Sequence, residues 1–322
     1  DAVPESPTQV PVVDLRGRAA ATELDHAWRH VGFVSVVGHG IEPSLFNEMR
    51  SLVARLFALG DEMKAHHTIT PDNYRGFVPL GFFTPNRAEM TGTMPDAYEA
   101  YKLHWECPPG HPVMGQCHLY GPNLWLPEVH DMVDVIMRYW SSCDALAGVL
   151  IEAVASSLGV NAATLHSMFN APLTNMTLMH YPEMPPEAGF GIHPHKDTNI
   201  LTLLHPDPVG GLEVADLNGD WFVAECPPDA MVVNVGEMLE MLSGGHLIAT
   251  PHRVVNRGSD RYSFPYFMVP DHDVVIEPLV TTRSGFEPRP MPVGELSAEV
   301  WRTNWPDEQP TSHGFDLGSL HT

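Results

Sequence analysis

Basic residues are scarce in this chain. Its 322 residues include 17 Lys and Arg against 40 Asp and Glu, which gives a formal net charge of −23. So acidic a chain is not expected to bind nucleic acid or an anionic membrane, because both would repel it. A solvated acidic surface is the commonest reason for such a charge, so the charge does not identify a cationic substrate. Local basic groups inside a pocket can still bind an acid.

Cysteine and long apolar runs are also sparse. Cys107, Cys117, Cys143 and Cys226 are scattered without CxxC spacing, which disfavours a disulfide framework or a zinc ribbon. We find no run of about 18 apolar residues that would predict a membrane span. The first residues, Asp1–Glu5, lack the charged and then apolar pattern of a secretory signal. We therefore expect a reducing, cytoplasmic location.

Apolar residues make up 43% of the chain, enough to bury a sizeable core and to exclude disorder. Neither internal repeats nor low-complexity segments are present. We expect residues 1–322 to form a single compact unit. Apolar residues at helical spacing predict helices over 19–31, 43–59 and 129–158, with shorter helices over 163–169 and 293–301. The expected buried stripe of the longest helix is Val133, Ile136, Met137, Trp140, Leu146, Leu150 and Val154.

Strands dominate the second half of the chain. Short strands are expected at 10–15 and 32–37, whereas 66–127 has little periodicity and predicts lids or pocket walls. From about residue 174, β-prone runs alternate with Gly and Pro turns, and Asn218-Gly219 marks a hairpin. The runs are 176–180, 199–205, 212–214, 221–223, 230–235, 253–256, 262–268 and 274–276. Such a series predicts a sandwich or barrel, of which a jelly roll is the leading option, in an α+β protein.

Potential metal ligands fall within the strand-rich region. Residues two apart on a strand point to one face, so His195 and Asp197 could reach the same ion. A neighbouring strand would have to supply His252. Two imidazoles and one carboxylate leave the opposite face of the metal open, which suits non-haem Fe(II) enzymes that activate O₂. His193 shares the same strand parity, but we expect it at the pocket wall or exposed, so that its replacement only weakens activity.

A basic motif follows shortly after His252. Arg261 and Ser263, separated by Tyr262, could hold a carboxylate co-substrate through a bidentate guanidinium and a hydroxyl. A lone His-x-Asp pair would carry little weight. Joined to a downstream histidine and an Arg-x-Ser motif, it predicts a functional site.

At these residues the chain resembles the Fe(II)/2-oxoglutarate-dependent dioxygenase superfamily, in the group that includes isopenicillin N synthase and the plant flavonoid and gibberellin oxygenases. The matching segments occur in the expected order over most of the chain. They are 12–15, 32–33, 38–41, 75–77, 180–182, 195–197, 201–204, 210–212, 234–239, 252–254 and 261–263.

This resemblance implies a fold and a set of residue roles. Residues 10–125 would form the N-terminal non-haem dioxygenase region, and residues 174–278 the double-stranded β-helix, or jelly-roll, core. His195, Asp197 and His252 would ligate Fe(II). The distal carboxylate of 2-oxoglutarate would be held by Arg261, Ser263 and Tyr181. The expected reaction uses O₂ and releases succinate and CO₂ while a small metabolite is hydroxylated, desaturated or cyclised. A carboxylate at Asp197 favours these outcomes over halogenation.

Two departures leave alternatives open. Met179 stands where plant members often have asparagine, so one contact to 2-oxoglutarate would be missing or supplied elsewhere. Isopenicillin N synthase uses its Arg-x-Ser motif for the substrate carboxylate and consumes no 2-oxoglutarate. The alternatives are therefore an oxidase of that type, a non-oxidative cupin-like metalloenzyme, or a binding protein with a degenerate site. The intact ligand set disfavours the last of these.

The substrate pocket is expected to draw on the poorly periodic region and on the barrel. Arg75, Phe77, Tyr98, Lys102 and Phe264 are the principal candidates, with Tyr74, His104, Lys196 and Tyr266 as further ones. We expect Arg75, within a glycine-flanked loop, to hold an anionic substrate group. The predicted partner is a small metabolite, such as an intermediate of secondary metabolism, and neither nucleic acid nor a membrane.

Overall fold

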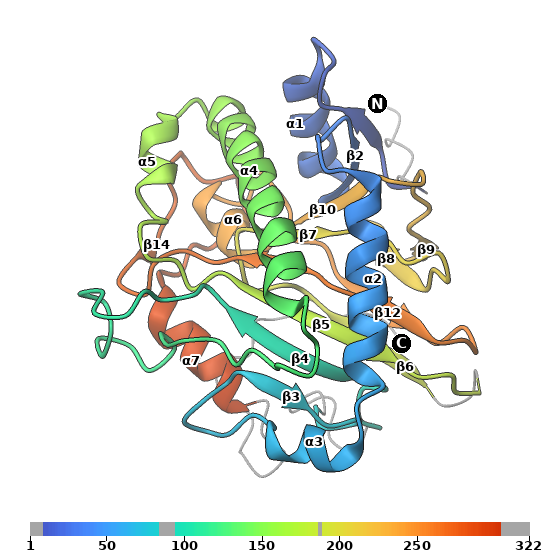
Figure 1. The fold of residues 1–322 in the computed structure, drawn as a ribbon. Helices are drawn as coiled ribbons and strands as arrows, with labels where there is room; N and C mark the ends of the chain where they lie inside the picture. Colours follow the sequence, from blue (N-terminus) through green and yellow to red (C-terminus); the bar gives the residue numbers. More distant parts are fainter. Residues whose placement is uncertain (1–8, 84–93, 186–188, 304–322) are drawn as a thin grey trace.

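The computed structural model describes residues 9–83, 94–185 and 189–303. Its large sheet has the order β1-β2-β10-β7-β13-β5-β4-β3, with β12 also paired to β5, and its small sheet has the order β6-β11-β8-β9 (Figure 1). The large sheet contains β1 (Val12–Asp14), β2 (Phe33–Val37), β3 (Gly76–Val78), β4 (Glu99–His104), β5 (Asn175–Tyr181), β7 (Leu201–Leu204), β10 (Met231–Val235), β12 (Arg261–Ser263) and β13 (Tyr266–Met268). The small sheet contains β6 (Phe190–His195), β8 (Leu212–Ala215), β9 (Trp221–Val223) and β11 (His252–Val255). A separate pair joins β14 (Val275–Ile276) to β15 (Met291–Pro292).

The two sheets pack face to face as a jelly roll. Val254 and Ile192 of the small sheet share an apolar cluster with Met179 and Tyr181 of the large sheet. Further along the interface, Val214 packs in a cluster with residues of β2 and β10. The α+β, jelly-roll fold expected from the sequence is confirmed.

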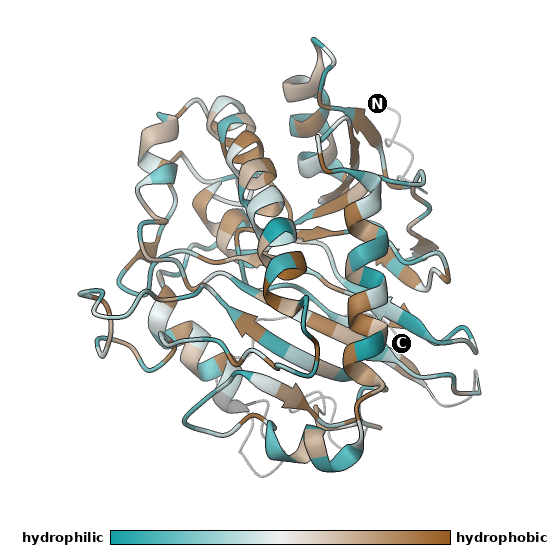
Figure 2. Ribbon diagram, viewed as in Figure 1, coloured by the Kyte–Doolittle hydropathy of each residue, from teal (hydrophilic) through white to brown (hydrophobic). Residues whose placement is uncertain are grey.

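Helices cover the outer face of the large sheet, where α2 and α4 contact β5, β12, β13 and β7 (Figure 1). The helices are α1 (Ala20–His30), α2 (Pro43–Phe57), α3 (Asp61–His66), α4 (Met132–Leu158), α5 (Ala162–His166), α6 (Glu237–Leu242) and α7 (Val293–Thr303). Hydrophobic residues concentrate on the strands and along α4, and loops are mostly hydrophilic (Figure 2). In the strands of the large sheet that these helices cover, side chains therefore alternate between the helices and the interior of the jelly roll.

The buried stripe of α4 differs from the expected one. Val133 and Met137 are exposed, by 47% and 37%, while Val135, Tyr139 and Cys143 are buried. This helix is apolar on several faces, so periodicity alone does not select the face that packs. By length and composition it is also apolar enough to cross a membrane, although charged residues interrupt it and the core helix of a soluble protein can be equally apolar. Its packing against α1, α2, α5 and the sheet accounts for that apolar content.

Other elements differ only locally. The predicted strand over 262–268 is interrupted between β12 and β13, because Pro265 has no N–H to donate to a ladder. Its carbonyl still accepts from the backbone N–H of Thr177, and the pairing with β5 keeps one register across the gap. The short helices α3 and α6 were not expected, and β3 and β4 lie within the two more ordered parts, 74–81 and 98–103, of the weakly periodic region.

Candidate metal and co-substrate site

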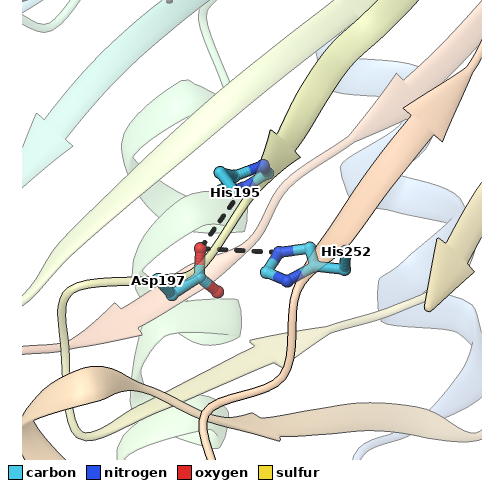
Figure 3. Close-up of side chains that lie close together, drawn as sticks. All are labelled: His195, Asp197 and His252. Carbon is cyan, nitrogen blue, oxygen red and sulfur yellow. Dashed lines mark ion pairs between the residues drawn. The ribbon is translucent and has the colours of Figure 1, made fainter. Parts of the chain in front are cut away.

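Two paired strands of the small sheet bring the histidines together. His195 ends β6, His252 begins β11, and the two are direct register partners. Their Nε2 atoms lie 3.5 and 3.6 Å from the same oxygen, Oδ1 of Asp197 (Figure 3). The three potential ligand atoms all lie within 4.8 Å of one another, so a single ion could contact all of them.

The Asp197 carboxylate is oriented by hydrogen bonds and not, as expected, by its place on a strand. Asp197 lies in the loop after β6, beyond the end of the strand, so strand alternation does not orient it. Its Oδ2 instead accepts hydrogen bonds from Thr202 Oγ1 at 2.6 Å and Asn234 Nδ2 at 2.9 Å. Its main-chain oxygen accepts from the N–H of Glu237 at 2.8 Å. These bonds leave Oδ1 turned towards the imidazoles.

Both imidazoles are held in the tautomer that a metal requires. Nδ1 of His195 lies 2.8 Å from the carbonyl oxygen of His193, and Nδ1 of His252 lies 3.2 Å from that of Thr250. A carbonyl oxygen only accepts, so each Nδ1 carries the hydrogen and the neutral ring presents its lone pair at Nε2. Burial alone would raise the pKa of Asp197. When the imidazoles are instead protonated, the charge of His252 and hydrogen bonds from both rings outweigh the effect of burial and hold the pKa of Asp197 well below the ordinary carboxyl value.

A buried guanidinium that has no acidic partner among the described residues lies in the same interior. Arg261 faces Tyr181 across the β12–β5 pair, and Ser263 faces Met179. The Arg261 Nε donates to the carbonyl of Gly210 at 2.7 Å, and its carbon Cζ lies 4.6 Å from the ring centroid of Tyr181. One terminal nitrogen, Nη1, is buried without a hydrogen-bond partner within the described residues. An unpaired buried cation is costly, so this position fits an anionic ligand such as a carboxylate.

Comparisons with known proteins agree with this geometry. Residues 10–128 match the family model for the non-haem dioxygenase N-terminal region in morphine synthesis, and residues 173–270 match that of the 2OG-Fe(II) oxygenase superfamily. A homoarginine-6-hydroxylase of Glycine max is 32% identical over 275 residues, which cover 81% of each chain. The chain belongs to the 2OG-Fe(II) oxygenase superfamily.

Solved structures extend the likeness to three dimensions. A 2OG-Fe(II) oxygenase family protein from Caulobacter crescentus is 27% identical, with a TM-score of 0.79 over 91% of this chain and 98% of its own. JOX2 in complex with 2OG, Fe and JA is 26% identical, with a TM-score of 0.76 over 97% of this chain and 89% of its own. The present oxygenase therefore uses Fe(II) and 2-oxoglutarate, as its donor set and its unpaired guanidinium fit.

Thr202 and Asn234, the hydrogen-bond donors to Asp197, were not assigned roles from the sequence. The segments that contain them, 201–204 and 234–239, were recognised only as part of the family pattern. Replacing Thr202 with valine keeps the shape and removes one donor to Oδ2. We expect the metal affinity to fall by about 10- to 100-fold, the range typical of groups that orient metal ligands.

Calorimetric titration with Fe(II) under anaerobic conditions measures this change. Thr174→Val is the matched control, because the Thr174 hydroxyl is equally buried but donates to the carbonyl of Val269. A Thr202→Val protein whose metal affinity stays within about twofold of wild type would contradict the role of this hydroxyl in orienting the ligand.

Some predicted pocket residues do face the interior. Lys102 and Thr177 are partners across the β4–β5 pair, and two residues further along each strand lie His104 and Asn175. Tyr98 belongs to the apolar cluster of Met179 and Tyr181 between the two sheets. Tyr74 belongs to the same cluster, and His104 packs against Trp301 of α7.

Phe77 and Phe264 were expected at the substrate pocket, but they lie on the helix-facing side of the sheet. Phe77 contacts Phe57 of α2, with ring centroids 6.1 Å apart. Phe264 contacts Tyr139 of α4, with ring centroids 5.2 Å apart. Strand alternation explains both, because their neighbours Gly76 and Ser263 occupy the interior side. Tyr266 is also on the helix side, where its hydroxyl donates to Asp144.

The remaining candidates have other partners. Arg75 donates to the carbonyl of Leu119 at 2.8 Å and lies against Gly121, while its Nε is buried without a hydrogen-bond partner in the described part of the chain, so its role at a substrate stays a prediction. Lys196 is 3.7 Å from a carboxylate oxygen of Glu240. His193 is not one of the three grouped metal-ligand candidates: its Nδ1 lies 2.7 Å from a carboxylate oxygen of Asp96, a partner that could not be predicted from sequence.

The position of Phe264 leads to a testable expectation. Phe264→Ala should lower the free energy of unfolding by about 3–5 kcal/mol, because a buried ring is lost from the contact with α4. The KM for 2-oxoglutarate of the protein that remains folded should not change. Chemical denaturation and steady-state kinetics at low temperature would test both. A stable variant with a raised KM would instead place the ring at the pocket.

Proposed function

We propose that this oxygenase oxidises a small-molecule metabolite at an iron held by His195, Asp197 and His252, with 2-oxoglutarate held by Arg261, Ser263 and Tyr181. The convergence of three ligand atoms, each fixed by its own hydrogen bonds, carries the proposal. The unpaired Arg261 nitrogen in the same interior supports the assignment of the co-substrate.

Each residue has a defined task. Asp197 supplies the negative charge of the metal site, and the imidazoles complete one face of it. Arg261 and Ser263 fix the distal end of the co-substrate, with Tyr181 protonated because burial raises its pKa to about 12. When bound, Fe(II) and 2-oxoglutarate activate O₂, so that a substrate C–H becomes C–OH while 2-oxoglutarate becomes succinate and CO₂. Apolar residues between the two sheets would limit the access of water to this reaction.

A small substrate is supported by the relatives. The Glycine max protein is named for homoarginine, and JOX2 was solved with JA. We also propose a reducing, cytoplasmic location, supported by four cysteines that are all free thiols. Hydroxylation, desaturation and cyclisation share this site chemistry, and identification of the reaction product would distinguish them.

The test is a metabolite screen scored by succinate release under O₂, together with anaerobic crystallisation in the presence of Fe(II) and 2-oxoglutarate. Succinate should form only when all three of Fe(II), 2-oxoglutarate and O₂ are present. Consumption of O₂ without 2-oxoglutarate would indicate an oxidase of the isopenicillin N synthase type. A purified protein that binds no ferrous ion would overturn the proposal.

A further inference from the structure

We propose that the ammonium of Lys102 binds a carboxylate of the primary substrate inside the jelly roll. The inference rests on the proposed function and narrows its substrate class to small carboxylic acids with an apolar body. Four observations support it: the missing acidic partner, the position of the side chain, its aromatic surroundings, and the cost of the buried charge.

Lys102 differs from the other lysines of the chain in its partners. Lys64 pairs with Glu99 at 2.9 Å, and Lys196 lies 3.7 Å from Glu240. Lys102 instead donates to the hydroxyl of Thr177 at 2.9 Å and has no carboxylate within ion-pair distance in the described part of the chain. A hydroxyl satisfies one of the three ammonium donors and none of the charge.

The sheet register places Lys102 on the same interior face of the large sheet as the residues that hold the metal ligand Asp197. A row of paired residues crosses the large sheet from His104 through Asn175 and Phe267 to Thr202. Thr202 holds Asp197, so this row faces the interior at the level of the metal ligands. Lys102 is two residues from His104 on β4 and therefore faces the same interior. By the same alternation it shares this face with Tyr181 and Arg261.

The surroundings of the ammonium are aromatic. Its nitrogen lies 5.8 Å from the ring centroid of Tyr74 and 6.0 Å from that of Phe83. Trp301 stacks on Tyr74 with ring centroids 4.5 Å apart. Aromatic faces attract a cation without neutralising it, so the site retains its preference for an anion. The same rings provide flat walls for an apolar body attached to that anion.

The buried charge has an energetic cost that an anion would offset. Lys102 keeps some accessible surface, yet burial lowers its pKa to about 8. His104 is neutral and adds no second positive charge, because burial and the charges of Arg75 and Lys102 hold its pKa well below the ordinary value. A substrate carboxylate would stabilise the protonated lysine and raise its pKa towards the ordinary value near 10.5.

A matched pair of probes tests the preference for an anion. 3-Phenylpropionate and its neutral amide are titrated anaerobically into the full chain loaded with Fe(II) and 2-oxoglutarate. Wild type should bind the acid more tightly than the amide. Lys102→Met should weaken binding of the acid by about tenfold or more and leave the amide unchanged, whereas Lys102→Arg should retain the preference. Lys64→Met, which removes a lysine that has its own acidic partner, is the control.

A second readout follows the lysine itself. The chain has only three lysines, so NMR of isotopically labelled lysine can resolve them, and Lys102→Met assigns the signal. The Lys102 signal should titrate near pH 8 and shift to higher pH when 3-phenylpropionate is added. An unmoved titration, or equal affinity of wild type for the acid and the amide, would overturn the inference. If Fe(II) and 2-oxoglutarate bind normally in that case, the proposed function stands; if they do not bind, the proposed function fails first.

Discussion

Asp197→Ala should abolish succinate formation and lower the Fe(II) affinity by at least about 100-fold. That is beyond the 10- to 100-fold effect typical of groups that only orient a ligand, because here a ligand itself is removed. The substitution deletes the single negative charge of the triad. It also leaves the Thr202 hydroxyl and the Asn234 amide without the acceptor to which both now donate.

Three measurements separate loss of the metal from loss of the fold. Anaerobic Fe(II) titration reports the affinity, 2-oxoglutarate turnover reports the activity, and thermal unfolding reports stability. Asp271→Asn is the control, because Asp271 is as buried as Asp197 but accepts hydrogen bonds from the backbone N–H groups of Asn170 and Ala171. It should keep its Fe(II) affinity. An Asp197→Ala protein that binds Fe(II) within about threefold of wild type would remove this carboxylate from the metal site.

The sequence was sufficient to predict residues whose chemistry is distinctive. Two histidines and a carboxylate at those positions have few other uses, so their convergence could be predicted before the topology was known. The route taken by Asp197 could not be predicted. It depends on where β6 ends and on donors from β7 and β10, and both are properties of the packed sheet.

The face to which a side chain points was harder to predict than the segment in which it lies. Phe77 lies on β3 and Phe264 directly follows β12, but a shift of one residue places a side chain on the other face of a sheet. The same ambiguity affected α4, where Val133 was expected in the core and is 47% exposed. Lys102 was expected at the pocket. That no described residue gives it an acidic partner emerges only when β4 is paired with β5, because the nearby Glu99 points to the other face and binds Lys64.

Arg261→Met should raise the KM for 2-oxoglutarate by about 30-fold or more, the equivalent of 2 kcal/mol or more for truncating one partner of a buried, hydrogen-bonded charge pair. The methionine fills the space of the stem but has no donor for a carboxylate. Arg261→Lys should lose less, because it keeps the charge while giving up the planar fork and the bond to Gly210. Uncoupled turnover of 2-oxoglutarate and anaerobic binding titrations measure the change.

Arg50→Met is the matched control for this prediction. The Arg50 guanidinium also lies over a tyrosine ring, that of Tyr262 at 5.3 Å, but on the helix-facing side of β12, where it pairs with Asp207. Its loss should leave the KM for 2-oxoglutarate unchanged. If Arg261→Met instead raised only the KM for the primary substrate, the guanidinium would hold the substrate carboxylate and not the co-substrate. In that case Lys102 could not be the principal anion site for the substrate, because one carboxylate would not need two separate cations across the same interior.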